Sequence, residues 1–185
     1  MPIPVHKPKK EDVLKCVAKF DDLYHTDGGL PDAAVEGYHR TFSNVLGFQQ
    51  PEGAETYSPV GDEAKPFITH LKPGFGLAYV SARPGQGVMT HTHDTNETFV
   101  VMEGTWKLQW EGDEGDEEVV LEEKDVISFE PGIQRRFECK TARDGAEKGV
   151  LLGVIGGDQP GGEYSPESVE KLKAAGVWPE DEAAE

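Results

Sequence analysis

The sequence predicts an all-β protein, and three observations support this prediction. Glycine and proline are frequent, with 22 and 13 residues respectively. The apolar runs are short, and turn-forming clusters such as RPGQG, EPG and ARDGAE separate them. Many short strands at close spacing indicate a β-sandwich or barrel rather than a helical bundle. A chain of 185 residues that is 36% hydrophobic can bury one proper core, so we expect a single domain.

Three regions follow one another along the chain. Residues 1–64 predict an N-terminal helix and a wrapping arm, residues 65–157 the barrel, and residues 158–185 a C-terminal helix with an acidic tail. The arm is rich in turn formers, so we expect it to be irregular. The aromatic residues expected to anchor it on the core are Tyr38, Phe42, Phe48 and Tyr57. The predicted strands of the barrel are 66–71, 75–82, 96–102, 105–110, 118–121, 125–129, 135–139 and 149–155.

Two short helices flank the predicted barrel. Within residues 11–24, Val13, Val17 and Phe20 recur at helical spacing and form one apolar stripe. A single short helix cannot bury this stripe alone, so we expect it to pack on the domain or on a second subunit. Residues 165–176 predict the second helix, because a capping serine and a proline begin it and a glycine follows it.

The charge and the cysteines narrow the classes of partner and compartment. A formal net charge of −17 argues against nucleic acid and anionic membrane surfaces as partners. We see neither a transmembrane run nor a secretory signal. Cys16 and Cys139 form no CxxC motif, which favours a reducing, cytoplasmic setting and structural roles as small apolar residues. The arm and the edge strands offer surface for a second copy, so we expect a homodimer.

The stretch HTHDTNE, residues 91–97, is the strongest chemical signal in the chain. On a β-strand alternate side chains share a face, so His91 and His93 point the same way. Glu97 follows a short turn, and a hairpin would bring it back over the two imidazoles. Two histidines and one carboxylate are the facial-triad ligand set of divalent iron, and they also suit manganese, nickel, cobalt or zinc. The alternative is a pair of hydrogen-bonded histidines near a turn.

At this point the chain resembles the cupin superfamily. Residues 85–104 match every fixed position of the first cupin motif, namely Gly85, His91, His93, Glu97 and Gly104. The resemblance covers about residues 66–156. It implies a double-stranded β-helix, or jelly-roll barrel, with a site inside its mouth. By the same resemblance, the two histidines and the glutamate are the candidate metal ligands.

The second cupin motif is degenerate in this chain. Gly132 keeps its place, whereas Lys124 stands where glycine is usual and Arg135 stands where the last histidine ligand is usual. Two further departures are Glu130 for proline and Cys139 for asparagine. Arginine stays protonated and has no lone pair to offer a cation. The resemblance therefore implies at most three protein ligands.

Two outcomes follow for Arg135, and the sequence leaves both open. In the first, the remaining triad binds a metal and Arg135, just beyond it, holds an anionic substrate through its planar fork. In the second, no metal binds, Arg135 pairs with Glu97, and the histidines act as hydrogen-bonding or acid–base groups. Strand alternation favours Arg135 as the inward residue, but a one-residue slip would turn Arg136 inward instead.

The same strands supply candidate pocket residues. With Arg135 inward, Phe137 faces the pocket as well. Other aromatic candidates for substrate binding are Tyr79, Phe99, Trp106 and Trp110, although aromatic residues at this spacing are more often core. His70, on a predicted strand, is a less favoured fourth ligand.

Three functions remain compatible with these features. The first is a metal-dependent enzyme that acts on a small anionic organic molecule by oxygen insertion, isomerisation or lyase-type proton removal. The second is a metal-free module that binds a small anion without catalysis. The third is a structural cupin with a vestigial pocket, which the intact first motif disfavours, because inward polar groups are costly unless satisfied.

Overall fold

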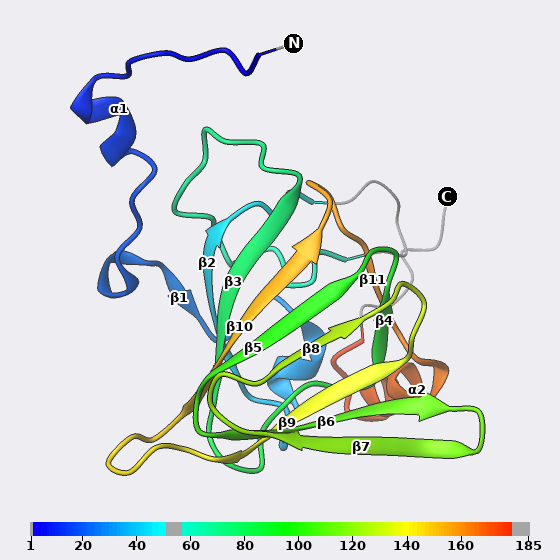
Figure 1. Ribbon diagram of the computed structural model, residues 1–185. Helices are drawn as coiled ribbons and strands as arrows, with labels where there is room; N and C mark the ends of the chain where they lie inside the picture. Colours follow the sequence, from blue (N-terminus) through cyan, green and yellow to red (C-terminus); the bar gives the residue numbers. More distant parts are fainter. Residues whose placement is uncertain (1, 51–56, 179–185) are drawn as a thin grey trace.

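Two antiparallel sheets face each other and close into a jelly-roll barrel (Figure 1). The computed structural model describes residues 2–50 and 57–178. The first sheet has the order β1-β2-β3-β10-β5-β8 and the second β11-β4-β9-β6-β7. The first comprises β1 (His25–Thr26), β2 (Thr41–Leu46), β3 (Phe75–Ala82), β10 (Gly149–Gly156), β5 (Glu97–Glu103) and β8 (Val126–Phe129). The second comprises β11 (Gly162–Tyr164), β4 (His91–His93), β9 (Arg135–Thr141), β6 (Thr105–Gly112) and β7 (Gly115–Leu121).

Seven of the eight predicted strands form, and their bounds lie close to the expected ones. They are β3, β5, β6, β7, β8, β9 and β10. The exception is 66–71, where only Ile68 makes a bridge, to Leu46. This segment donates two backbone hydrogen bonds to β2 and then leaves it, so it forms no regular ladder. The expectation of a strand there was wrong.

The expected wrapping arm contributes to the barrel itself. Its residues 41–46 form β2, which pairs along the side of β3, so this part is regular rather than irregular. Strand β2 is almost wholly buried. It was not predicted, because its apolar and polar residues do not alternate. The four aromatic anchors do pack on the core or against its satellite clusters. Residues 51–56 of the arm and the acidic tail 179–185 lie outside the described residues.

The N-terminal helix is much shorter than predicted. Helix α1 spans Lys10–Leu14, and Phe20–Asp22 form a separate 3₁₀ turn. In Figure 1 this blue segment stands away from the barrel, and Val13 and Val17 are about half exposed. A short helix gains most of its stability from packing, so without a partner the apolar stripe does not extend it. Both cysteines were expected to be structural, small apolar residues, but Cys16 is exposed, whereas Cys139 is buried.

The C-terminal helix forms as predicted. Helix α2 spans Pro166–Ala174, and the Ser165 hydroxyl caps it by accepting a hydrogen bond from the Ser168 amide at 3.1 Å. Leu172 is fully buried, and Trp178 packs edge-on against Tyr164 of β11. Within the described residues, no helix is long and apolar enough to cross a membrane.

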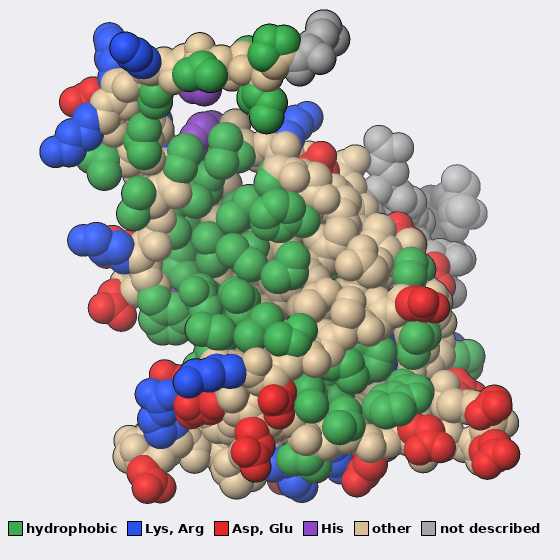
Figure 2. Space-filling model, viewed as in Figure 1, with side chains coloured by type: hydrophobic (Ala, Val, Ile, Leu, Met, Phe, Trp, Pro, Cys, Tyr) green, Lys and Arg blue, Asp and Glu red, His purple; other side chains and the backbone are tan. Residues whose placement is uncertain are grey.

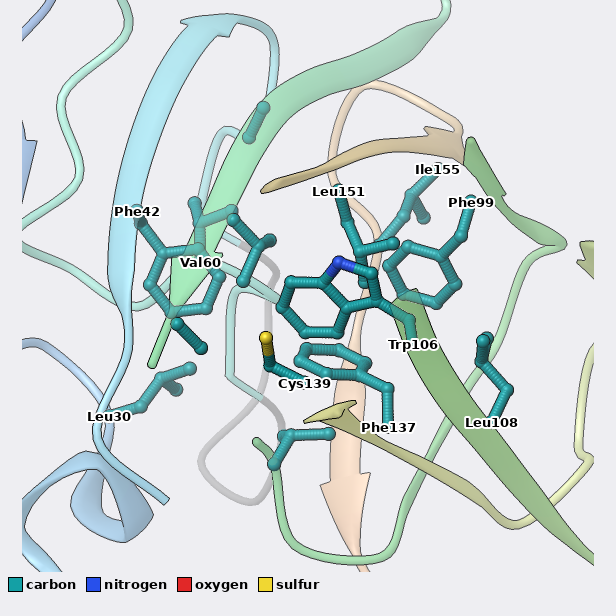
Figure 3. Close-up of a cluster of buried hydrophobic side chains, with 14 of the residues drawn as sticks. Leu30, Phe42, Val60, Phe99, Trp106, Leu108, Phe137, Cys139, Leu151 and Ile155 are labelled. Carbon is teal, nitrogen blue, oxygen red and sulfur yellow. The ribbon is translucent and has the colours of Figure 1, made fainter. Parts of the chain in front are cut away.

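The core lies between the two sheets, and Figure 3 shows its centre. Phe137 of β9 meets Phe99 of β5 edge-on at 5.3 Å and Trp106 of β6 at 5.7 Å between ring centroids. Leu151 and Ile155 of β10 complete this layer. Inward residues of both sheets thus interdigitate, as expected for a closed β structure. This packing fixes the strands that carry the site described below.

Two turn positions, one in each cupin motif, have a left-handed backbone. Gly104 has a φ of +79°, and a Cβ there would lie 2.1 Å from the Thr141 carbonyl oxygen, so only glycine fits. Lys124, which stands where cupins usually have glycine, has a φ of +78°. A side chain disfavours this left-handed conformation by roughly 1 kcal/mol. The structure therefore keeps the glycine-type turn despite the substitution.

Candidate metal centre and adjoining cavity

His91, His93 and Glu97 come together inside the barrel, from opposite sheets. The histidines are the two ends of β4 in the second sheet, whereas Glu97 begins β5 in the first. The expected hairpin is therefore wrong in form, because the turn at 94–96 crosses from one sheet to the other. It still brings the carboxylate over the imidazoles. All three side chains are buried, and one potential ligand atom from each lies within 4.8 Å of the others.

Backbone carbonyls fix the orientation of both imidazoles. Nδ1 of His91 lies 2.8 Å from the Met89 carbonyl oxygen, and Nδ1 of His93 lies 2.9 Å from that of Gly161. A carbonyl only accepts, so Nδ1 carries the proton and Nε2 keeps its lone pair in the neutral ring. Burial and, to a smaller extent, the neighbouring His93 together lower the pKa of His91 to about 3. The His91 ring is therefore neutral at physiological pH and available as a ligand.

Arg135 lies on the far side of Glu97 from the histidines. Its Nε and Nη2 lie 3.0 and 2.9 Å from Oε2, whereas Oε1 of Glu97 lies 3.6 Å from Nε2 of His93. Burial alone would raise the pKa of Glu97, but His93 and Arg135 outweigh it and lower the pKa to about 2. The guanidinium thus holds one carboxylate oxygen and leaves the other facing the imidazoles.

The choice between the two arginines is settled by burial. Arg135 is 1% exposed, and its Nη1 donates to the Ile133 carbonyl at 2.9 Å. Arg136 turns to the surface and contacts Gln109 and Asp116. Arg135 pairs with Glu97, as expected for a site without a metal. The three potential ligand atoms nevertheless converge, as expected for a metal site.

A small, largely apolar cavity of about 30 Å³ adjoins the three candidate ligands. Its apolar walls are Leu30, Phe42, Phe48, Pro59, Val60, Ala78, Val80, Val88, Phe99, Phe137, Gly153 and Ile155. Its polar lining comprises the triad and Arg40, Tyr57 and Tyr164. Arg135 is not in this lining, although we expected it to hold substrate. It borders a separate polar cleft beside α2 instead.

Of the aromatic residues predicted to bind substrate, some line the cavity and others lie elsewhere. Phe99 and Phe137 line the cavity. Trp106 is fully buried behind Phe137, and its indole N–H donates to the Glu103 carbonyl. Tyr79 lies on the outer face of the first sheet against Phe20, and Trp110 borders the outer cleft. The expectation that Tyr79 faces the pocket was therefore wrong, because its neighbours Ala78 and Val80 are the inward residues of β3.

His70 is remote from the candidate centre. It is exposed, and its Nε2 lies 3.4 Å from the Cys16 sulfur near the N-terminal segment. The cluster of His91, His93 and Glu97 is the only group of three potential ligands found in the described residues.

A second buried network, which sequence reasoning missed, borders the same cavity. Asp32 and Arg40 form an ion pair at 2.8 Å in which both side chains are fully buried. Asp32 also accepts the Tyr164 hydroxyl at 2.6 Å and the Met89 amide at 3.0 Å. Tyr57 stacks on Tyr164. These residues sit in turns or at strand ends of the expected arm and tail, where no local motif marks them.

A jelly-roll barrel with an inward pair of histidines and a glutamate defines the cupin class of protein. The family model described as "Cupin domain" matches residues 78–146. The resemblance indicated by the first motif is thus confirmed over residues 78–146. A search of curated proteins finds no match.

Solved structures resemble this chain at low sequence identity. The vicilin of Solanum melongena is 13% identical with a TM-score of 0.55, and the match covers 90% of this chain and 41% of that one. Hydroxypropylphosphonic acid epoxidase from S. wedmorenis is 14% identical with a TM-score of 0.47, covering 75% of this chain and 58% of that one. The chain thus spans less than two thirds of either protein. At such identities, the vicilin match shows the fold alone.

Proposed function

We propose that this cupin binds a divalent transition-metal ion through His91, His93 and Glu97 and acts on a small organic molecule seated in the adjoining cavity. One observation carries the proposal. Two oriented Nε2 atoms and a free carboxylate oxygen converge at one side of an otherwise apolar, buried space. Two imidazoles and one carboxylate suit iron, manganese, nickel or zinc.

The position of Arg135 is compatible with this ligand set. It engages Oε2 of Glu97 and so leaves Oε1 as a monodentate ligand. It also orients the carboxylate, as partners beyond the ligands commonly do at metal sites. With only three protein ligands, such an ion would keep open positions for substrate or water and would polarise an oxygen bound there.

The charges of the site favour an anionic substrate oxygen. His91 is neutral, and the charge of Glu97 is balanced by Arg135. The charge of Asp32 is balanced by Arg40. A divalent ion would thus add about two uncompensated positive charges to a low-dielectric space, where an anionic group is strongly attracted. The cavity beside the triad, of about 30 Å³, limits the part of such a molecule that it can hold to a few non-hydrogen atoms.

Metal content provides the test. Protein purified without a histidine tag, then incubated with Fe²⁺, Mn²⁺, Ni²⁺ or Zn²⁺ and desalted, should retain about one equivalent of one of these ions. The double variant His91→Ala/His93→Ala should lose it. His70→Ala, which removes an exposed histidine outside the centre, is the matched control and should retain it. Failure of all four ions to bind wild-type protein would end the metal proposal.

The Glu97–Arg135 pair itself favours one competing function. A buried carboxylate that is already neutralised needs no metal ion, so the barrel could bind a small ligand as a metal-free module. In that case wild-type and His91→Ala/His93→Ala protein would bind the same ligand without added metal. Metal-dependent ligand binding would instead favour the metal-assisted function.

A further inference from the structure

The outer cleft beside α2, which Arg135 and Trp110 border, is far larger than the cavity beside the triad. Its volume is about 490 Å³, within the range of about 300–1,000 Å³ that is common for ligand pockets. Among the described residues, the two spaces have no lining residue in common. The proposed metal function therefore gives the outer cleft no role, although it has room for a whole small molecule.

The outer cleft lies between the outer face of the second sheet and the first two turns of α2 (Figure 1). On the sheet, β9 and β6 pair in a register that sets Arg136 opposite Gln109, and Nε of Arg136 donates to Oε1 of Gln109 at 3.1 Å. On the helix, Glu167 and Lys171 form the other wall. Lys171 lowers the pKa of the Glu167 carboxyl, and Arg136 contributes to this shift from the sheet. The charged groups of the two walls therefore lie close enough to act on one molecule.

Charges of both signs line the outer cleft and offset one another. Arg136 lies 3.8 Å from Asp116, and Lys171 lies 2.8 Å from Glu167. The remaining charged lining residues carry one charge of each sign and are Arg135 and Glu111. The formal charge of the lining is thus zero, whereas that of the whole chain is −17. A charged ligand would have to displace one of the paired groups, and an anion would also approach against the net charge of the protein.

The paired groups keep hydrogen-bonding capacity that a neutral ligand can use. A guanidinium has five N–H donors, an ammonium three, and a carboxylate about four acceptor sites, so one ion pair occupies only part of each group. The distance of 3.8 Å between Arg136 and Asp116 leaves both groups open to a further partner. A hydroxyl group donates and accepts at once, so it can bridge a cation and a carboxylate while their charges stay balanced.

Two further features extend this chemistry. Trp110 packs on the core and also borders the outer cleft, where it adds an aromatic surface to polar walls. A second hollow of about 260 Å³ adjoins the cleft and contains another ion pair, between Lys107 and Glu138 at 3.2 Å. The residues common to both hollows are Tyr38, Gln109 and Arg136. Balanced ion pairs thus continue beyond the cleft, along the outer face of the same sheet.

We propose that the outer cleft binds a neutral molecule rich in hydroxyl groups, of the class of monosaccharides and disaccharides. Arg136 and Lys171, with their carboxylate partners, hold its hydroxyls from opposite walls. Trp110 contacts the C–H groups of a sugar ring, because these carry a partial positive charge that the face of an indole attracts. The adjoining hollow receives a second ring. This site is separate from the triad and requires no metal.

The test measures the binding of sugars in the presence of EDTA, so that its result does not depend on the metal proposal. The neutral probes are glucose, galactose, mannose, N-acetylglucosamine, maltose and cellobiose, and the charged counterparts are glucuronate and glucosamine. Saturation-transfer NMR detects binding, and calorimetry gives the dissociation constants. Arg136→Met and Lys171→Met each alter one wall at a partly exposed side chain. Arg83→Met, in which an exposed arginine paired with Glu147 outside the cleft is removed, is the matched control.

At least one neutral sugar should bind the wild-type protein, and more tightly than both charged sugars. Arg136→Met and Lys171→Met should each weaken this binding by about tenfold, whereas the control should change it by less than about twofold. An increase in salt from about 0.05 to about 0.5 M should also change the affinity by less than about twofold, because the ligand has no net charge. His91→Ala/His93→Ala should bind the sugar as the wild type does.

Three results would overturn the proposal. The first is that no neutral sugar binds the wild-type protein at about 10 mM. The second is tighter binding of glucuronate or glucosamine, which would show that the cleft selects a charged ligand. The third is an unchanged affinity in both Arg136→Met and Lys171→Met, which would place the bound sugar elsewhere on the protein. Because the two variants alter different walls, the failure of one to fold leaves the other as the test.

Discussion

Replacing Arg135 by methionine should destabilise the metal-free protein strongly and strengthen metal binding. Arg135 and Glu97 form a buried pair, with side chains 1% and 6% exposed and two nitrogens near 3 Å from one oxygen. Removal of one partner leaves an unpaired buried carboxylate, which typically costs about 3–5 kcal/mol. For a chain of this size each kcal/mol corresponds to about 2–4 °C, so the melting temperature should fall by about 6–20 °C.

The pH and metal dependence of this loss distinguish it from simple misfolding. An unpaired carboxyl can take up a proton, so the pKa of Glu97 should rise in the variant, and the destabilisation should be larger at pH 8 than at pH 5. A divalent ion replaces the missing positive charge. Its affinity should therefore increase by about tenfold or more, and its binding should restore stability.

Urea unfolding with EDTA and with added metal measures both effects. Glu97→Gln combined with Arg135→Met should recover much of the lost stability, because no unpaired charge remains. Arg136→Met, in which a neighbouring surface arginine is removed, should change the free energy of unfolding by about 0.5 kcal/mol or less. An Arg135→Met protein as stable as wild type at pH 8 in EDTA would refute this reasoning, as would weaker metal binding.

Three further outcomes are expected. Lys124→Gly should raise the free energy of unfolding by up to about 1 kcal/mol in urea titrations, because it removes the side chain that strains a backbone with a φ of +78°. A lower free energy of unfolding in this variant would contradict the proposal that Lys124 is strained. The pKa of His91 is lowered to about 3 in the folded protein, so between pH 6.5 and 3 the unfolded chain binds one more proton at this residue than the folded chain does. The free energy of unfolding should therefore fall by about 1.4 kcal/mol per pH unit as the pH decreases from 6.5 towards 3. His91→Phe should flatten this dependence in thermal melts. Light scattering should show a homodimer, because hydrophobic side chains gather on the outer face over β3, β10 and β5 (Figure 2) and because Val17 and Phe20 are also exposed. The double variant Val17→Asp/Phe20→Asp should be monomeric. A monomeric wild-type protein would refute the expectation.

Local spacing in the sequence was sufficient for several features. Period-two patterns between turns predicted seven strands, because side-chain direction alternates along any strand regardless of its neighbours. The same rule placed His91 and His93 on one face and Arg135 rather than Arg136 inside. The α2 helix also followed from its own ends, since a cap and a proline act within one turn.

Other features depend on partners that are distant in the chain. Strand β2 was missed because its burial comes from pairing with β3 and from the core, not from its own alternation. The N-terminal helix was overpredicted because an apolar stripe lengthens a helix only where something packs on it. The pairing of Glu97 with Arg135 joins residues 38 positions apart, and that of Asp32 with Tyr164 joins residues 132 apart.

The sequence by itself therefore determined the cupin-like barrel and the three candidate ligands, because both follow from the spacing of residues that are close together in the chain. Only the tertiary structure decided what surrounds them. It placed Arg135 behind Glu97 instead of in the cavity, and it brought Arg40 from the N-terminal arm to the cavity wall. Closure of two sheets brings together side chains whose separation along the chain carries no periodic signal, so no local pattern could have predicted those two positions.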